Sequence, residues 1–183
     1  MAERITEMRK LFLLRHAKSS WDEPAVADHD RPLNKRGHQA AKLMAGYMAR
    51  SCFHPALVLI STSRRTQETW NVIEHRLEGT SAAIEDGLYE AGKGDLMHRL
   101  RKVDDHIASV MVIGHNPGLG RLAADLVGHN GEPEVLERLH AKFSTGALAV
   151  IDLDIAHWAA LEAGTGRLVA YTRPKDLDER DEG

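Results

Sequence analysis

Three short stretches of the chain consist only of apolar residues. They cover residues 11–14, 57–60 and 110–113. Continuous apolar runs of this length are typical of strands that are buried on both faces, as in a parallel sheet covered by helices on either side. The pattern therefore predicts three central strands.

Between these runs the apolar residues recur three or four positions apart, which is helical spacing. The segments with this spacing are 40–48, 66–77, 96–103 and 119–126. Strands and helices thus alternate through the first 127 residues, and two later strands are expected at 147–153 and 167–172. This order predicts an α/β fold, a three-layer sandwich with a mainly parallel central sheet flanked by helices.

The length of 183 residues favours a single domain over 1–183, with a core from about 10 to 174 and a frayed, charged tail at 176–183. The content of 43% hydrophobic and 28% charged residues is ordinary for a globular protein. The net charge is -3, so the chain has no overall positive field that would attract nucleic acid or anionic lipid. We therefore expect neither a nucleic acid nor a membrane as a partner.

Cys52 is the only cysteine of the sequence. One cysteine excludes a disulfide framework within the chain and a metal site built from several thiolates, which favours a reducing compartment. The first apolar run, residues 11–14, is far too short for a signal-peptide core or a membrane span. These observations predict a cytoplasmic protein.

Basic residues and histidines directly follow the three apolar runs. Arg15 and His16 follow the first run, residues 61–65 with two arginines follow the second, and residues 114–118 with His115 follow the third. Because ligands of α/β sheets bind beyond the carboxyl ends of the strands, these residues are expected to meet at one edge. A lone histidine after a strand is more often structural, but three such segments together indicate an anion site.

The segment after the third run adds a feature that favours phosphate. Asn116 and Pro117 are residues preferred at the start of a helix. His115 would then lie beside a helix N-terminus, where free backbone N–H groups bind phosphate. Asn116 is therefore a candidate substrate-binding residue.

This set of side chains suits phosphoryl transfer. The guanidinium groups of arginines such as Arg15 and Arg65 neutralise charge on phosphoryl oxygens. A neutral imidazole attacks phosphorus well, so one of His16 and His115 is expected to attack while the other, protonated, binds the oxygens. The glycine loop of nucleotide hydrolases and the helical metal motifs with paired histidines are both absent. The carboxylates after the first strand are interpreted as solvated loop charges: Asp22, Glu23, Asp28 and Asp30.

Four segments, in order, resemble the histidine phosphatase superfamily. The segment Leu-Leu-Arg-His-Ala at 13–17 resembles its Arg-His-Gly signature, with Ala17 where glycine is usual. The segments 31–37, 61–69 and 114–117 resemble further blocks of the family, and the match extends over about 10–127. The short chain and the sequence Arg-His-Ala-Lys-Ser-Ser-Trp at 15–21 resemble the SixA-type phosphohistidine phosphatases.

The resemblance implies a phosphoglycerate-mutase-like fold and a phosphatase that uses no metal and no organic cofactor. It implies that His16 is the nucleophile and that Arg65, rather than Arg64, belongs to the phosphate pocket. The residues implied to bind the phosphoryl group are Arg15, Arg65 and His115, with an added hydrogen bond from Ser19.

The larger branch of the same family carries a carboxylic acid that protonates an alkoxide leaving group. Glu90 falls in about the corresponding place. A general acid and a solvated loop glutamate are comparably good interpretations of Glu90. An imidazole leaves far more readily than an alkoxide, so a phosphohistidine phosphatase needs no strong acid.

Three functions stay open on the sequence. The leading hypothesis is a phosphohistidine phosphatase acting on a phosphorylated protein, such as a histidine-containing phosphotransfer domain, because the short chain leaves little room for a lid over the site. The second is a phosphatase for a small phosphorylated metabolite, and the third is a phosphate-binding module without turnover. Several residues are candidates for the pocket rim, although a surface role is favoured for each: Lys18, Trp21, Arg36, His38 and Arg64.

Overall fold

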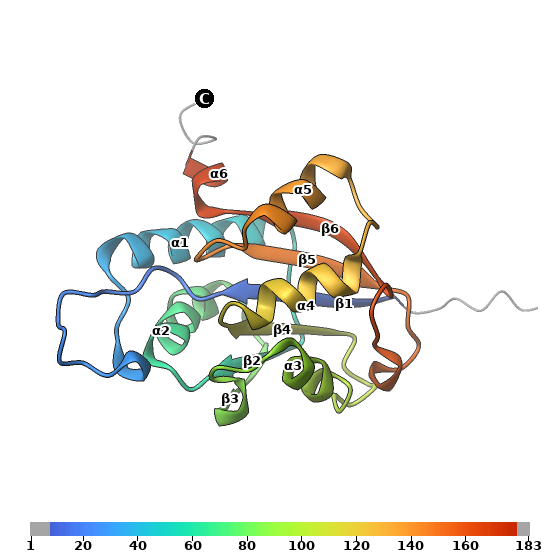
Figure 1. Cartoon of the computed structure of the whole chain (residues 1–183), viewed down its shortest axis with the longest axis horizontal. Coiled ribbons are helices and arrows are strands. Elements are labelled where there is room, and N and C mark those ends of the chain that lie inside the picture. The colour runs from blue at the N-terminus through green and yellow to red at the C-terminus, as the bar shows by residue number, and fades with distance from the viewer. Residues whose placement is uncertain (1–7, 179–183) are drawn as a thin grey trace, which may run out of the picture.

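A six-stranded sheet forms the centre of the protein in the computed structural model, which describes residues 8–178 (Figure 1). The strand order is β3-β2-β4-β1-β5-β6. The first four of these strands are mutually parallel, β5 is antiparallel to β1, and β6 is antiparallel to β5. The strands are β1 (Arg9–Arg15), β2 (Leu57–Ser61), β3 (Ser81–Glu85), β4 (Ser109–Gly114), β5 (Leu148–Leu153) and β6 (Gly166–Thr172).

Helices cover both faces of the sheet, and the alternation of side chains along β1 explains how. Leu11 and Leu13 face one core, which α3, α4 and α5 cover, while Phe12 and Leu14 face a second core under α1, α2 and α6. This arrangement confirms the predicted three-layer α/β fold. The helices are α1 (Lys35–Arg50), α2 (Arg64–Ile73), α3 (Lys93–Leu100), α4 (Gly118–Val127), α5 (Pro133–Ala141) and α6 (Pro174–Asp178).

The sequence pattern missed one strand and two helices. Strand β3 lies at the sheet edge, and its residues are exposed or half-buried, so it has no continuous apolar run. Helix α6 has five residues and buries only Leu177, so it leaves almost no periodic pattern. Helix α5 buries Leu136 and Leu139 three positions apart, a pattern that the sequence analysis overlooked.

The charged tail expected at 176–183 begins with ordered structure instead. Helix α6 includes Asp176, whose carboxylate accepts hydrogen bonds from Arg173, and Leu177 is buried in the second core. The remainder of the expected tail, 179–183, lies outside the described residues. The single domain over 1–183 stays a prediction.

A close backbone contact places α1 against the loop that follows β1. Asn34 caps α1 by accepting a hydrogen bond from the Gly37 N–H at 2.8 Å. A Cβ atom at Gly37 would lie 2.1 Å from the carbonyl oxygen of Lys18. Only glycine permits this approach, which holds the loop at 17–19 beside the carboxyl end of β1.

No helix within residues 8–178 combines the length and the apolar character that a membrane crossing requires.

Candidate active site

A cavity of about 570 Å³ opens at the carboxyl ends of the central strands. The strands β1, β4 and β2 are direct neighbours, so the segments that follow them converge there. All seven residues predicted for the site line this cavity: Arg15, His16, Ser19, Arg65, Glu90, His115 and Asn116.

His16 is a buried, neutral imidazole whose tautomer the structure defines. Its Nδ1 lies 2.7 Å from the carbonyl oxygen of Ala17, which only accepts, so Nδ1 carries the proton and Nε2 keeps its lone pair. Burial and, to a smaller extent, the charge of Arg65 lower the pKa of His16 to about 3, although the Ala17 hydrogen bond acts in the opposite direction. His16 is therefore uncharged at neutral pH.

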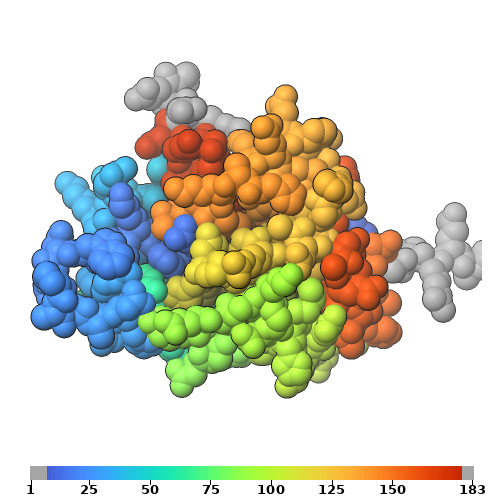
Figure 2. All heavy atoms as spheres, viewed as in Figure 1, coloured from blue at the N-terminus to red at the C-terminus, as the bar shows by residue number. Residues whose placement is uncertain are grey.

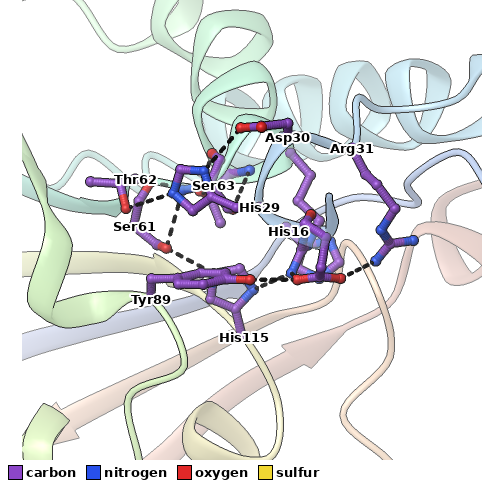
Figure 3. A network of polar contacts seen from close by, with 12 residues as sticks. His16, His29, Asp30, Arg31, Ser61, Thr62, Ser63, Tyr89 and His115 are labelled. Carbon is purple, nitrogen blue, oxygen red and sulfur yellow. Dashed lines mark hydrogen bonds and ion pairs between the residues drawn. The ribbon is translucent and has the colours of Figure 1, made fainter. Parts of the chain in front are cut away.

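His115 faces His16, with 5.3 Å between the ring centroids (Figure 3). Its Nδ1 lies 3.3 Å from Nη2 of Arg65, and its Nε2 lies 2.8 Å from the Ser61 hydroxyl. A guanidinium only donates, so Nδ1 accepts and the Nε2–H donates to Ser61. Burial, followed by the charge of Arg65, lowers the pKa of His115 to about 4. His115 is therefore uncharged in the protein without phosphate, and its protonation while it binds phosphoryl oxygens stays a prediction.

Arg65 lies in the first turn of α2 and is buried at the floor of the cavity. Its side chain donates to the Asp28 carbonyl oxygen at 2.6 Å and to Oδ2 of the Asp28 carboxylate at 3.1 Å. Thr69, one turn further, donates to the Arg65 carbonyl and accepts from the Ala17 N–H. Helix α2 thereby joins the arginine to the loop that carries His16.

The neighbouring Arg64 does not belong to the cavity. Its side chain is 58% exposed and donates to Glu68 one turn along the helix. The placement of Arg65 inside and Arg64 outside agrees with the register that the sequence resemblance implied.

The remaining predicted residues differ in how far their polar groups are engaged. Arg15 donates to the Phe143 carbonyl at 2.9 Å, and burial lowers its pKa. Asn116 uses both ends of its amide, donating to Phe143 and accepting from the Gly120 N–H. The sequence pattern predicted that Asn116 directly precedes a helix. Helix α4 instead begins at Gly118, so Pro117 is the residue before it. The Ser19 hydroxyl has no hydrogen bond to another of the described residues.

Asp28 contradicts the interpretation of the loop carboxylates as solvated charges. In addition to Arg65 it accepts hydrogen bonds from Arg31 at 2.8 Å and from the Tyr89 hydroxyl at 2.7 Å. The Tyr89 hydrogen bond and the two guanidinium groups hold the pKa of Asp28 well below its usual range. Asp28 is itself half exposed, so it differs from the exposed residues Asp22, Glu23 and Asp30 in these hydrogen bonds rather than in burial. Sequence reasoning missed Asp28 because two of its three partners, Arg65 and Tyr89, come from segments far along the chain.

Tyr89 is a second residue that the sequence analysis did not identify. Its ring packs edge-on against His115 at 5.5 Å and against His29 at 4.8 Å between centroids (Figure 3). His29 is in turn held by the Thr62 hydroxyl at 3.0 Å. Tyr89 therefore connects the loop of Asp28 to the second histidine. Its position next to Glu90 was the one available sequence signal.

Glu90 has a backbone φ of 56°, in the left-handed region that residues other than glycine seldom adopt. Such a conformation costs on the order of 1 kcal/mol and persists where the surroundings impose it. The side chain lines the cavity and makes no hydrogen bond or ion pair with the other residues in 8–178. The geometry is compatible with both interpretations of Glu90.

An aromatic and basic pair forms part of the cavity rim. The Arg31 guanidinium lies 3.5 Å from the ring centroid of Trp21, and Trp21 is 75% exposed. Lys18 also lines the cavity, whereas Arg36 and His38 do not. Across residues 8–178 the structure contains no group of three or more metal-binding side chains.

We predict that Asp28→Asn lowers phosphatase kcat/KM by about tenfold or more, because hydrogen bonds between charged groups are worth roughly 1.5–3 kcal/mol. The substitution removes the carboxylate that orients Arg65 and keeps the size of the side chain. Asp30→Asn is the matched control, since Asp30 lies in the same loop, loses the same charge and is 70% exposed. Equal rates for the two variants would refute a positioning role for Asp28.

Comparison with known proteins agrees with this geometry. Residues 11–111 match the histidine phosphatase superfamily, branch 1. The phosphohistidine phosphatase SixA of Escherichia coli is 28% identical over 171 residues, which cover 92% of this chain and 96% of that protein. The uncharacterized protein Rv1276c of Mycobacterium tuberculosis is 34% identical over 163 residues, which cover 88% of this chain and all of the relative.

A solved structure has the same fold. The protein histidine phosphatase SixA complexed with tungstate superposes with a TM-score of 0.74 at 27% identity, covering 92% of this chain and 99% of that one. The chain therefore belongs to branch 1 of the histidine phosphatase superfamily, and within it to the SixA-like phosphatases.

Proposed function

We propose that the protein removes phosphoryl groups from phosphorylated histidines of another protein through a covalent phosphohistidine on His16. One observation carries this proposal: the unprotonated Nε2 of a neutral His16 lies in a cavity that Arg15, Arg65 and His115 also line. The SixA relative that holds tungstate, a tetrahedral oxyanion like phosphate, supports the same assignment.

The proposed reaction has two steps. In the first, the lone pair of His16 Nε2 forms a bond to phosphorus while the bond from phosphorus to the substrate imidazole breaks, and that imidazole takes up a proton. In the second, a water oxygen forms a bond to phosphorus while the bond from phosphorus to His16 Nε2 breaks, so that His16 regains its lone pair and inorganic phosphate leaves with the water proton. Arg15 and Arg65 neutralise the phosphoryl oxygens in both steps.

His115 changes its protonation state in this proposal. It is neutral without phosphate because of burial and Arg65. A phosphoryl dianion offsets the charge of Arg65, which favours protonation of His115 Nδ1 and supplies a further donor to the oxygens. Ser19 is proposed to donate another hydrogen bond from its hydroxyl, whereas the amide of Asn116 shapes the wall.

The second candidate is a phosphatase for small phosphate monoesters, which the place of Glu90 in the cavity favours. An alkoxide leaving group needs a proton, and Glu90 would supply it. The substrate panel therefore contains a phosphohistidine peptide and several sugar phosphates, with a chelator present. A strict requirement for a divalent metal would contradict the proposed mechanism.

Glu90→Gln distinguishes the two candidates. We expect turnover of the phosphohistidine peptide to change less than about threefold, because the imidazole leaving group needs no strong acid. Turnover of sugar phosphates, where present, is expected to fall about 100-fold, which is within the usual contribution of a general acid. Unchanged rates on both substrates would remove Glu90 from the mechanism. Sugar phosphates turned over faster than the peptide by the unaltered protein would favour the second candidate.

A further inference from the structure

A second cavity, of about 830 Å³, adjoins the first. Lys18 and Thr145 line both cavities, so the two are adjacent. One wall of the second cavity is a face of α1, and the opposite wall contains Ser144 and the start of α6. Figures 1 and 2 show α1 and α6 near each other at the upper left of the molecule. We call this second cavity the basic groove.

Cations without carboxylate partners line the basic groove. Among the described residues, none of five lining side chains forms a salt bridge: Lys18, Arg36, Lys42, Arg50 and Lys175. Asp178 is the single acidic residue of the lining within 8–178. The whole chain has a net charge of -3, so this local excess of positive charge is opposite to its average. Charges of one sign around a hollow surface attract oppositely charged ligands.

The dimensions of the basic groove favour a macromolecular ligand. Its α1 wall extends from Arg36 to Arg50, and 14 residues at 1.5 Å per residue correspond to about 21 Å. Gly46 lies on the same face between them, and the guanidinium of Arg50 lies next to it, 3.2 Å from where a Cβ atom would be. A single phosphate or sugar phosphate is much shorter than this wall. An acidic helix or extended segment of a protein has a matching length and charge.

We propose that the basic groove binds an acidic surface segment of the phosphorylated protein substrate while the phosphohistidine of that substrate occupies the adjoining catalytic cavity. This inference rests on the proposed function and adds the substrate surface that the enzyme recognises. Exposed Trp21 lies on the rim of the catalytic cavity, and the basic groove joins that cavity through Lys18 and Thr145.

Binding is tested with a dye-labelled, glutamate-rich peptide of about 14 residues that carries no phosphohistidine. The unaltered protein should bind it, and added salt should weaken the complex because exposed charges are screened. Lys42→Glu combined with Arg50→Glu is expected to weaken binding at least tenfold. Arg76→Glu combined with Lys102→Glu is the matched control, since both residues are exposed, lie outside the basic groove and change the net charge equally. Equal weakening in the control, or no binding by the unaltered protein, would overturn the proposal.

Turnover separates this inference from the proposed function. Two phosphohistidine peptides of equal length are compared, one flanked by glutamates and one by glutamines, together with free phosphohistidine. The groove variant should raise KM for the glutamate peptide about tenfold and leave free phosphohistidine within about twofold. A uniform loss on all three substrates would contradict the groove assignment. If the unaltered protein hydrolyses none of the three substrates, the proposed function is refuted. The peptide-binding titration would still test whether the basic groove binds an acidic segment.

A graded variant guards against loss of folding. Lys42→Gln combined with Arg50→Gln removes two charges without introducing carboxylates, and its melting temperature should match that of the unaltered protein. Intermediate weakening of peptide binding by this folded variant is expected. Unchanged binding would overturn the proposal even if the charge-reversed variant failed to fold.

Discussion

His16→Ala is expected to reduce phosphatase turnover by at least 1,000-fold and to abolish covalent labelling of the enzyme by a phosphohistidine substrate. The reason is that the variant lacks the Nε2 lone pair, and no other neutral imidazole in the cavity is equally free. Both nitrogens of His115 are engaged, by Arg65 and by Ser61. The measurement is rapid mixing with substrate labelled on phosphorus, followed by quenching at alkaline pH, where an acid-labile phosphohistidine survives.

The control for this experiment is His29→Ala. His29 packs against Tyr89 in the same region and lies outside the residues that line the catalytic cavity. The His29→Ala variant should therefore still acquire the covalent phosphoryl label and keep much of its turnover. Full activity in His16→Ala would reject the assignment of the nucleophile. If the unaltered protein acquires no covalent label but binds phosphate tightly, the result would favour a binding module without turnover.

Arg65→Ala is expected to lower kcat/KM by about 100-fold and to weaken inhibition by inorganic phosphate together with it. Two causes act in the same direction. The variant loses the guanidinium that neutralises the phosphoryl oxygens, and each such charged hydrogen bond is worth roughly 1.5–3 kcal/mol. It also leaves the Asp28 carboxylate without its Arg65 partner at the site where an anion must bind. Steady-state kinetics and phosphate inhibition constants measure both effects.

Arg64→Ala provides a matched control for this prediction. Arg64 precedes Arg65 on the same helix, has the same charge, and points to Glu68 at the surface. Its removal should change kcat/KM less than about threefold, since exposed ion pairs contribute roughly 0–1 kcal/mol. Arg65→Lys should restore little activity, because an ammonium group lacks the forked donors of a guanidinium. Equal losses in Arg64→Ala and Arg65→Ala would contradict the pocket assignment.

Much of the fold was predictable because burial leaves a direct mark on the sequence. The three central strands are buried on both faces, so four consecutive residues in the middle of each must be apolar. The edge strand β3 has no such requirement and was missed. The convergence of the predicted residues was predictable for a related reason, since parallel strands deliver the residues that follow them to one edge.

The sequence by itself determined the layer order and the edge that holds the site, and together with the family resemblance it indicated seven of the residues that line the cavity. Only the tertiary structure decided that Asp28 joins Arg65, Arg31 and Tyr89, and that unpaired cations from α1 and the start of α6 line one groove. The physical reason is that periodicity reports which side of an element is buried. It carries no information about which distant loops meet, because that depends on how the elements pack in three dimensions.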